Sequence, residues 1–506
     1  MPVPMYWLGL TICITCIQFV IANNTEAEKV DVVCKKDNSS ICTAPILRPL
    51  PEHAYAMLKN GQRVCRIVNG LWQVSGFHSY RPDPARAIAD MDTLVSAGYT
   101  TFDLADHYGP AEVFVGDFIE RRWKRAKVEF ASKATGNNST SNTTSIAYDS
   151  NATAAVQDDT LMTAATTEHG EPLSFHTKWV PSPGAMPAKK VRRALDTSRY
   201  RMAMPTLDLV AFHWWDYSDL RYRDMLSHAA VLTMPQSQDG SDITKPPILK
   251  GLAVTNFDLE HLQEIVEPSG ALMQRSGFRG VDVVSAQVSF SIIDSRPLDG
   301  GLLRWSERHG ISIMAYGVLM GGFLSDAWLG VDEPTPEDDP SLQLDTASLQ
   351  KYFGFLLRWG SWQTFQELLR ELRRIANKHQ MAVQSRARLF WSGSGQAGYE
   401  WQYPSSEAKV SIAHVAIRWV LQQSSPSSSA TICTLLGTRI GHPWGLAAKH
   451  AHENSVVFAF ELDAKDLADI DRARTAPNTR PLLNSLGDCG SEYRHVPGEY
   501  EGHRPD

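Results

Sequence analysis

The sequence predicts an α/β fold, a (β/α)8 TIM barrel with disordered or loop insertions. Short apolar runs alternate with helical patterns along most of the chain, and this rhythm gives eight candidate strands. Polar or aromatic residues follow each run, at the point where the strand should end. Eight strand–helix alternations favour a closed parallel barrel over an open sheet.

The predicted strands, in chain order, are Arg66–Leu71, Tyr99–Leu104, Leu173–Lys178, Leu207–His213, Ile248–Val254, Val281–Val288, Ile311–Tyr316 and Thr431–Leu436. Helical patterns lie between most of them, at Pro84–Ala97, Pro110–Trp123, Pro187–Tyr200, Leu259–Val266, Pro297–His309, Trp362–Lys378 and Ala413–Gln423. Pro110 stands at the first position of its helix, where a missing backbone N–H is tolerated.

Changes in composition divide the chain into four predicted segments. They are a leader over residues 1–22, an irregular extension over 23–60, the barrel over 61–475 and a C-terminal tail over 476–506. Three insertions interrupt the barrel, at 134–172, 325–350 and 382–408. The first is rich in Ser, Thr, Asn and Ala and is expected to be disordered. The second is rich in proline and acidic residues and is expected to form a long loop.

The N-terminal segment is uncharged and strongly apolar from Trp7 to Ala22. It is short for a membrane-spanning helix, so we favour a secretory signal peptide over an uncleaved membrane anchor. An ordinary apolar helix is the third interpretation. A signal would place the protein in the secretory pathway or an endomembrane lumen, and without it the protein would be cytoplasmic. Glycosylation acceptors occur at Asn23, Asn38, Asn137, Asn138, Asn142 and Asn151.

Bulk composition excludes some classes of function. The net charge of −7 gives no reason to expect a nucleic-acid partner. Five of the seven cysteines lie beyond the leader without a Cys-x-x-Cys spacing, so no metal or redox framework is expected. A disulfide between Cys34 and Cys42 and two free thiols are equally compatible with the sequence. Membrane attachment is expected only through the N-terminal apolar segment.

The chemistry-bearing residues share one predicted position, the carboxyl ends of the strands. In strand order they are Trp72, Asp103 with Tyr108, Lys178, His213, Thr255 with Asn256, Gln287, Tyr316, and Gly437 with Arg439. Any one of them has an ordinary structural interpretation, such as a surface lysine or a buried histidine. Their shared placement favours a site, because barrel enzymes present their catalytic groups at this rim.

An Asp, a Tyr, a Lys and a His form a proton-donating set. A phenol has a pKa of about 10 and is a weak acid at neutral pH, but a nearby ammonium favours the phenolate. Asp103 would keep that ammonium charged, and His213 would orient the substrate oxygen by a hydrogen bond. Such a set suits protonation of a developing alkoxide, with hydride supplied by a cofactor.

The sequence resembles the aldo/keto reductase family. The matching motifs are GLWQ, FDLADHYGPAE, TKWVPSPG, LDLVAFHWW, VTNF, SAQVSFSIID, AYGVLMGGFL, VAIRWVLQQ and LLGTRIG, spread over residues 63–475 in the family's order. The resemblance implies a barrel that binds NADP(H) at the carboxyl-terminal rim. It implies reduction of an aldehyde or ketone, or the reverse oxidation, with a small-molecule carbonyl substrate and no metal.

The resemblance also assigns roles to residues. The catalytic set is Asp103, Tyr108, Lys178 and His213, with Tyr108 as proton donor. The cofactor-binding residues are Thr255, Asn256, Gln287, Tyr316, Gly317, Leu319, Gly437, Arg439 and Asn454, with Tyr316 stacked on the nicotinamide. An arginine at the adenosine end suits a 2′-phosphate, which favours NADP over NAD. Trp72 and Trp214 are expected to wall the substrate pocket.

Two alternatives stay open. Lys133, in VEFASKATG, also resembles the end of the family's third strand and lies nearer to Tyr108 in sequence than Lys178 does. We favour Lys178 because its flanks match better and the His213 strand follows it directly. The second alternative concerns function, since the chain also resembles cofactor-binding regulatory subunits of the same fold, such as potassium-channel β-subunits.

Overall fold

The computed structural model describes residues 50–76, 80–134, 166–167, 170–237, 244–334, 344, 346–391, 409–424 and 428–494. These residues belong to one compact unit, Leu47–Asp506. The predicted leader, Cys34, Cys42 and the six glycosylation acceptors lie outside the described residues. None of the helices in the described part of the chain is long and apolar enough to cross a membrane.

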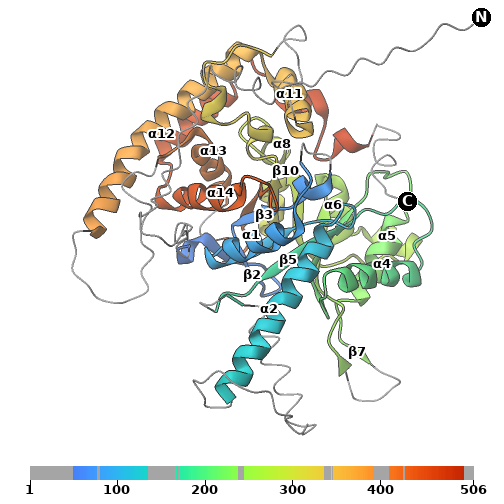
Figure 1. The fold of residues 1–506 in the computed structure, drawn as a ribbon. Helices are drawn as coiled ribbons and strands as arrows, with labels where there is room; N and C mark the ends of the chain where they lie inside the picture. Colours follow the sequence, from blue (N-terminus) through green and yellow to red (C-terminus); the bar gives the residue numbers. More distant parts are fainter. Residues whose placement is uncertain are drawn as a thin grey trace, which may run out of the picture. The chain divides into compact units, whose positions relative to one another are not determined.

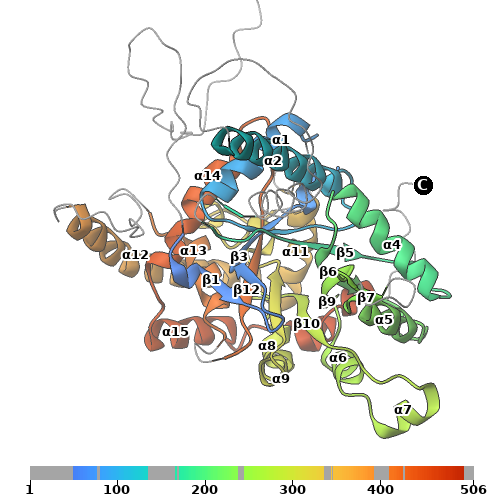
Figure 2. The same ribbon diagram turned by 90° about the horizontal axis from the view of Figure 1, so that it is seen from below.

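A closed barrel of eight parallel strands forms the centre of this unit (Figures 1 and 2). Its strands are β3 (Ile67–Gly70), β4 (Thr101–Asp103), β5 (Ser174–Trp179), β6 (Leu207–His213), β9 (Leu249–Thr255), β10 (Val283–Ser289), β11 (Ser312–Tyr316) and β12 (Ile432–Gly437). Neighbours in chain order are paired, and β12 pairs with β3 to close the barrel. All eight match predicted strands, and the predicted fold class is confirmed.

Helices surround the strands, as Figure 2 shows. The longer ones are α1 (Pro84–Ser96), α2 (Ala111–Ala134), α4 (Ala188–Arg201), α5 (Tyr222–Val231), α11 (Ala347–Trp359), α12 (Trp362–Trp391), α13 (Ile412–Leu421) and α15 (Ala464–Arg474). The shorter ones are α6 (Leu259–Val266), α7 (Gly270–Ser276), α8 (Arg296–Asp299), α9 (Leu302–Arg308), α14 (Leu446–Asn454) and α16 (Leu482–Leu486). A small hairpin, β7 (Gln236–Ser237) with β8 (Thr244–Lys245), stands apart from the barrel.

A second hairpin precedes the barrel, where an irregular extension to residue 60 was expected. Strands β1 (Tyr55–Met57) and β2 (Arg63–Cys65) pair antiparallel. Leu58 and Val64 of this hairpin are buried with side chains from the barrel strands, namely Val68, Leu209, Val284, Met314 and Cys433. These strands of three residues are too short to show an alternating pattern in the sequence, and burial against the barrel stabilises them.

Three predicted helices have different bounds in the structure. Helix α2 runs on to Ala134 instead of ending at Trp123, so Lys133 lies within a helix and not at a strand end. The predicted helix Pro297–His309 is two helices, α8 and α9, because Gly301 adopts a left-handed conformation with φ of 81°. Helix α12 runs on to Trp391, so the expected insertion at 382–408 begins inside a helix.

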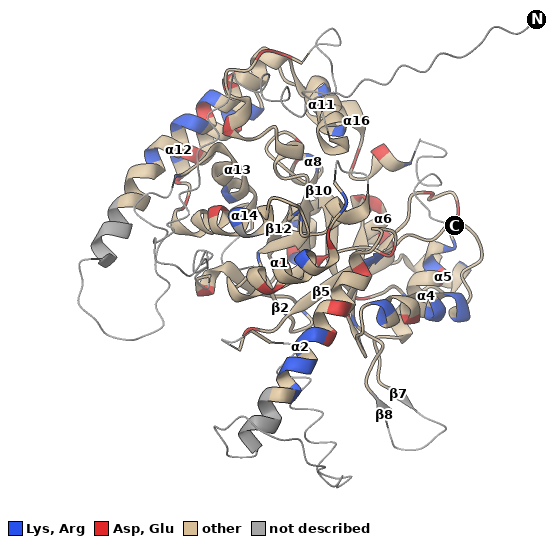
Figure 3. Ribbon diagram, viewed as in Figure 1, with Lys and Arg blue, Asp and Glu red and all other residues tan. Residues whose placement is uncertain are grey.

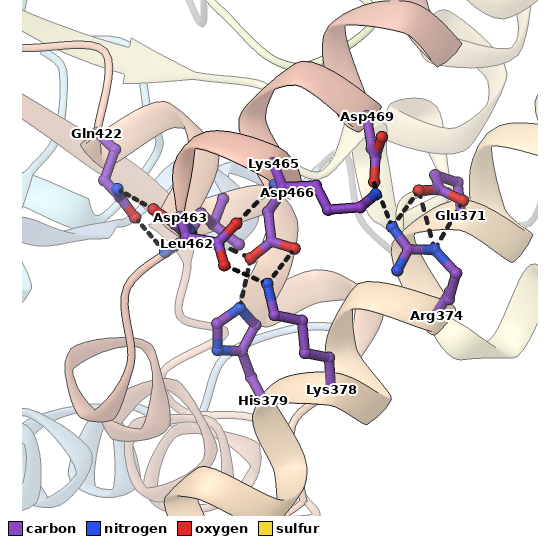
Figure 4. A network of polar contacts seen from close by, with 10 residues as sticks. All are labelled: Glu371, Arg374, Lys378, His379, Gln422, Leu462, Asp463, Lys465, Asp466 and Asp469. Atoms are coloured by element: carbon purple, nitrogen blue, oxygen red, sulfur yellow. Dashed lines mark hydrogen bonds and ion pairs between the residues drawn. The ribbon is translucent and has the colours of Figure 1, made fainter.

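The long helix α12 is held to α15 by a network of charged residues (Figure 4). Asp466 is fully buried and accepts hydrogen bonds from His379 Nε2 at 2.7 Å and Lys378 Nζ at 2.8 Å. Nearby, Asp469 accepts from Arg374 at 2.7 Å. A buried carboxylate with two donors from one helix fixes how that helix packs against its neighbour.

Replacing Asp466 with Ala should lower the free energy of unfolding by about 2–4 kcal/mol, because His379 and Lys378 lose a buried acceptor. Lys378 keeps Asp463 as a partner, which limits the loss. Chemical denaturation of the variant measures it. Glu371→Gln is the matched control, since Arg374 keeps Asp469 and its change should stay below about 1 kcal/mol. Equal effects of the two changes would contradict the packing role of Asp466.

Candidate active site

The carboxyl ends of three neighbouring strands bring together the four predicted catalytic residues. Asp103 ends β4, Lys178 is the last residue but one of β5, and His213 ends β6. Tyr108 lies on the turn from β4 to α2, where its backbone N–H donates to the Ala105 carbonyl at 3.1 Å. The Asp103, Lys178 and His213 side chains are buried and Tyr108 is half-buried. Parallel pairing keeps these strand ends at one level of the barrel.

Asp103 and Lys178 form a buried ion pair. Lys178 Nζ donates to Asp103 Oδ1, and Gln287 Nε2 donates to Asp103 Oδ2 at 2.7 Å. Burial lowers the pKa of Lys178 against the opposing attraction of Asp103, and burial raises the pKa of Asp103 against Lys178 and Gln287. Both pKa shifts favour the neutral form of the side chain, so burying this pair of charges costs free energy. Each residue therefore depends on the other to stay charged.

Tyr108 lies beside the lysine of this pair. Lys178 Nζ is 5.0 Å from the centre of the Tyr108 ring. The sequence predicted that the ammonium lowers the pKa of the phenol, but burial raises the pKa of Tyr108 well above its usual value, and the Asp103 charge adds to the shift. Desolvation of the phenol is the largest cause, and the attraction of the Lys178 ammonium, which is paired with Asp103, does not offset it. Tyr108 is therefore a fully protonated hydroxyl at neutral pH.

His213 faces the site as a neutral imidazole. Burial lowers its pKa to about 3. Its Nε2 lies 3.3 Å from the amide nitrogen of Asn256, and its ring meets the edge of Tyr493 at a centroid distance of 5.5 Å. A neutral imidazole carries one N–H and one acceptor nitrogen, which suits hydrogen bonding to a polar ligand rather than charge stabilisation.

Acid should destabilise the fold through three buried histidines, His176, His213 and His414, whose burial lowers their pKa to about 3, 3 and 4. Above an unfolded pKa of about 6.5 both states are neutral, and below it only the unfolded state binds the proton. Stability should therefore fall as the pH falls, by about 2 kcal/mol per histidine between pH 7 and pH 5. Denaturation at the two pH values measures this loss. In the variant His176→Asn the loss between pH 7 and pH 5 should be smaller by the contribution of one histidine. Equal stability at both values would contradict it.

The predicted nicotinamide-binding residues lie next to His213. Asn256 has a left-handed backbone with φ of 59°, and its Oδ1 accepts from the Tyr316 hydroxyl at 2.8 Å. Gln287 lies one strand further round and bonds to Asp103, as described above. Two buried hydroxyls close to them, Thr255 Oγ1 at the end of β9 and Ser289 Oγ at the end of β10, have no hydrogen-bond partner among the described residues. The rim thus holds polar atoms that a polar ligand would satisfy.

The predicted phosphate and adenosine residues lie on the loops after β11 and β12. Gly317 follows β11 with φ of 69°, and a Cβ placed there would be 2.3 Å from the Tyr352 hydroxyl. Leu319 lies at the start of the next 3-10 turn, Met320–Gly322. Gly437 ends β12, and Arg439 follows in a left-handed conformation with φ of 47°. Asn454 ends α14.

The two predicted pocket tryptophans differ. Trp72 begins a 3-10 turn directly after the first barrel strand and is half-buried. Trp214 is 1% exposed and packs on Phe212 and Tyr222. Its indole N–H donates to the carbonyls of Asp216 and Asp219, at 2.6 and 3.1 Å. The structure thus gives Trp214 a packing role in its own loop instead of a place in the pocket wall.

Three residues at the rim were not predicted from the sequence. Lys351 and Tyr352 lie on α11, just beyond the expected 325–350 loop, and Tyr493 lies in the expected tail. Lys351 Nζ donates to the Tyr493 hydroxyl at 2.5 Å, and that hydroxyl lies 3.3 Å from the Tyr316 hydroxyl. Apolar residues in the tail, Leu482 and Cys489, were the available signal, and both are buried.

A model of the aldo/keto reductase family matches residues 66–391, which is more than half of the chain. The chain belongs to the aldo/keto reductase family. Membership of this family supports an oxidoreductase in general, and family members generally bind a nicotinamide cofactor. The orphaned hydroxyls of Thr255 and Ser289 fit this class of ligand, since a dinucleotide is rich in hydrogen-bonding groups.

Individual relatives of this chain are distant. Flagellar radial spoke protein 5 of Chlamydomonas reinhardtii is 24% identical over 180 residues, which cover 34% of this chain and 31% of the relative. The match therefore spans about a third of that protein. Among solved structures, a thermostable aldo-keto reductase bound to the inhibitor epalrestat is 17% identical with a TM-score of 0.46, covering 83% of this chain and 99% of its own. An aldo/keto reductase of Klebsiella pneumoniae in complex with NADP and acetate is 16% identical with a TM-score of 0.46, covering 85% and 97%.

Proposed function

We propose that this reductase uses NADPH to reduce an aldehyde or ketone to an alcohol, or runs the reverse reaction. One observation supports it above the others, the buried Asp103–Lys178 ion pair beside the half-buried Tyr108 hydroxyl. A reductase needs a proton donor at the carbonyl oxygen and a group that stabilises the donor's conjugate base. Tyr108 and Lys178 supply these two functions.

In the proposed reaction the bound nicotinamide supplies or accepts the hydride. Tyr108 holds the proton, because its raised pKa keeps the hydroxyl protonated, and donates it from the phenol oxygen to the developing alkoxide. The phenolate left behind is stabilised by the Lys178 ammonium, which Asp103 keeps charged. His213 orients the carbonyl through one imidazole nitrogen.

We propose that Asn256, Gln287 and Tyr316 hold the nicotinamide, with Thr255 beside them. Gly317 and Leu319 would border the pyrophosphate, and Gly437, Arg439 and Asn454 the adenosine end. The guanidinium of Arg439 matches a 2′-phosphate, which supports NADP over NAD. Trp72 remains the candidate for the pocket wall.

The test is oxidation of NADPH, followed by its absorbance, with a panel of aromatic and aliphatic aldehydes. Turnover of at least one carbonyl is expected. Binding of NADPH without turnover of any carbonyl would instead support the second candidate, a cofactor-binding subunit of a larger assembly. That candidate is favoured by the resemblance to a protein named for the flagellar radial spoke and by the contact of the Tyr493 ring with His213.

The route of the protein through the cell is a separate proposal. Residues 1–22 are proposed to act as a signal peptide or membrane anchor, because they are apolar and free of charge. Fusing residues 1–60 to a reporter tests this, and a reporter that stays in the cytoplasm would contradict it.

A further inference from the structure

The last described residues, 482–494, cross the rim of the barrel and are here named the C-terminal segment. They comprise α16 and a 3-10 turn, Ser491–Tyr493. Helix α16 packs against α11 and α8, and Figure 3 shows α16 beside α11. The segment therefore joins the part of the rim that follows β10 and β11.

An ion pair fixes the segment to the barrel. Arg296 is 1% exposed and binds Asp294 through two hydrogen bonds, at 2.7 and 2.9 Å. Its other edge binds Glu492 of the segment, with NH1 and NH2 donating at 2.7 and 2.9 Å. Bidentate pairs of this kind are strong and directional. Asp294 alone can neutralise the buried Arg296 guanidinium. The contact with Glu492 is therefore not needed to balance that charge, and its effect is to hold the segment against the barrel.

Two further contacts hold the turn over Asn256. Arg494 binds Asp258 at 2.8 Å and lies over the Tyr217 ring at 4.7 Å. The backbone of Gly490 touches Asn256, since a Cβ placed at Gly490 would be 2.1 Å from the Asn256 carbonyl oxygen. Only glycine fits there, with φ of 78°. The turn thus lies directly on a residue proposed to hold the nicotinamide.

Tyr493 is the residue of the segment that contacts the candidate active site. Its ring meets His213 edge-on, and its hydroxyl lies 3.3 Å from that of Tyr316 and accepts from Lys351. Within the described residues no carboxylate lies within ion-pair distance of Lys351. Instead its ammonium is surrounded by aromatic rings, those of Tyr316, Tyr352, Phe355 and Tyr493.

We propose that the C-terminal segment is an autoinhibitory strap, which closes the nicotinamide end of the site and must move before a dinucleotide binds. The inference rests on the proposed function, because it places the dinucleotide on Asn256, Tyr316 and Gly317. Of these, Asn256 and Tyr316 now contact Gly490 and Tyr493 of the segment. A site that is open for only a fraction of the time binds its ligand more weakly by that fraction. Loosening the strap therefore strengthens binding.

The experiment measures NADPH affinity and amide hydrogen exchange of residues 482–494 in the full chain and two variants. Glu492→Gln weakens the Arg296 contact while Asp294 still neutralises the guanidinium. Tyr493→Phe removes the hydroxyl bonds to Lys351 and Tyr316. Each should increase exchange in the segment and tighten NADPH binding by about tenfold, which corresponds to about 1.4 kcal/mol. Glu461→Gln, which alters the Glu461–Arg418 pair outside the segment, is the matched control and should change neither quantity.

The outcomes separate the strap from the proposed function. Faster exchange with unchanged or weaker NADPH binding would overturn the strap. The segment would then have no effect on NADPH affinity, or it would itself form part of the NADPH site. Unchanged exchange in both variants would overturn the role of the Glu492 and Tyr493 contacts. If no protein in the set binds NADPH or NADH, even where the segment exchanges rapidly, the proposed function itself fails.

Discussion

Tyr108→Phe is expected to lower carbonyl turnover by a factor of about 10²–10⁴ and to leave NADPH affinity nearly unchanged. The change removes one hydroxyl, which is the proposed proton source, and keeps the ring that lies against Lys178. Steady-state kinetics with the best aldehyde, together with a fluorescence titration of NADPH, measures both quantities. Phenylalanine fills nearly the same volume, so the fold should not change.

The matched control is Tyr200→Phe, since Tyr200 is 87% exposed and lies on α4 away from the rim. Its turnover should match that of the unmodified protein. Full activity of Tyr108→Phe would exclude Tyr108 as the donor. Loss of turnover together with loss of NADPH affinity would point instead to a damaged site, and the assigned role would not stand.

Asp103→Asn is expected to lower the free energy of unfolding by about 3–5 kcal/mol at neutral pH, because the buried Lys178 amine then has to stay charged without a counter-charge or give up its proton on folding. Asparagine has nearly the same shape, so the effect is electrostatic. Turnover should fall as well, since an uncompensated Lys178 releases its proton and no longer stabilises a phenolate. Chemical denaturation and the aldehyde assay measure the two losses.

The pH dependence of this variant has a definite sign. Burial already lowers the pKa of Lys178, and removal of Asp103 lowers it further. Below the unfolded value of about 10.4 the unfolded chain then binds a proton that the folded protein does not hold, so stability rises as the pH rises towards that value. The deficit against the unmodified protein should therefore shrink from pH 7 to pH 9.

A second buried aspartate offers the control. Asp208 pairs with Lys250 at 2.7 Å, but the Lys250 side chain is 51% exposed and is solvated without its partner. Asp208→Asn should cost less than Asp103→Asn and should show no comparable recovery at high pH. Equal losses and equal pH profiles would mean that the buried charge of Lys178 is not the cause.

The barrel and the gathering of polar side chains at its rim were predictable because their signals are local. Each strand is a short apolar run, and a polar residue comes at its end, as Asp103 and His213 do. The choice between two lysines also depended on local sequence. Lys178 lies on β5 and contacts Asp103, whereas Lys133 lies within α2, whose pattern contains no proline or glycine between Asp117 and Ala134.

The contacts of the C-terminal segment with the rim were not predictable in the same way. Residues 488–494 are mostly polar, and their order depends on Arg296, which is 196 positions before Glu492 in the chain. A polar stretch without hydrophobic periodicity is predicted to be an irregular tail when its contact partners are unknown. The pKa of Tyr108 was misjudged for a similar reason. The sequence predicted a lysine nearby, but it did not show that Asp103 would pair with it or that desolvation would dominate the pKa of the phenol.

Cys489 lies in the C-terminal segment, so the position of the segment would control the reactivity of its thiol. Its thiol is 1% exposed, and burial raises its pKa well above the usual value, so the closed protein presents an unreactive thiol at this point. Cys65 and Cys433 are equally buried but lie on β2 and β12, outside the segment. Movement of the strap would thus expose one nucleophilic sulfur and leave the other two protected. Cofactor binding and oxidation of the Cys489 thiol would then both depend on the equilibrium between the closed and open positions of the segment. An oxidising compartment would oxidise this thiol only in the open form.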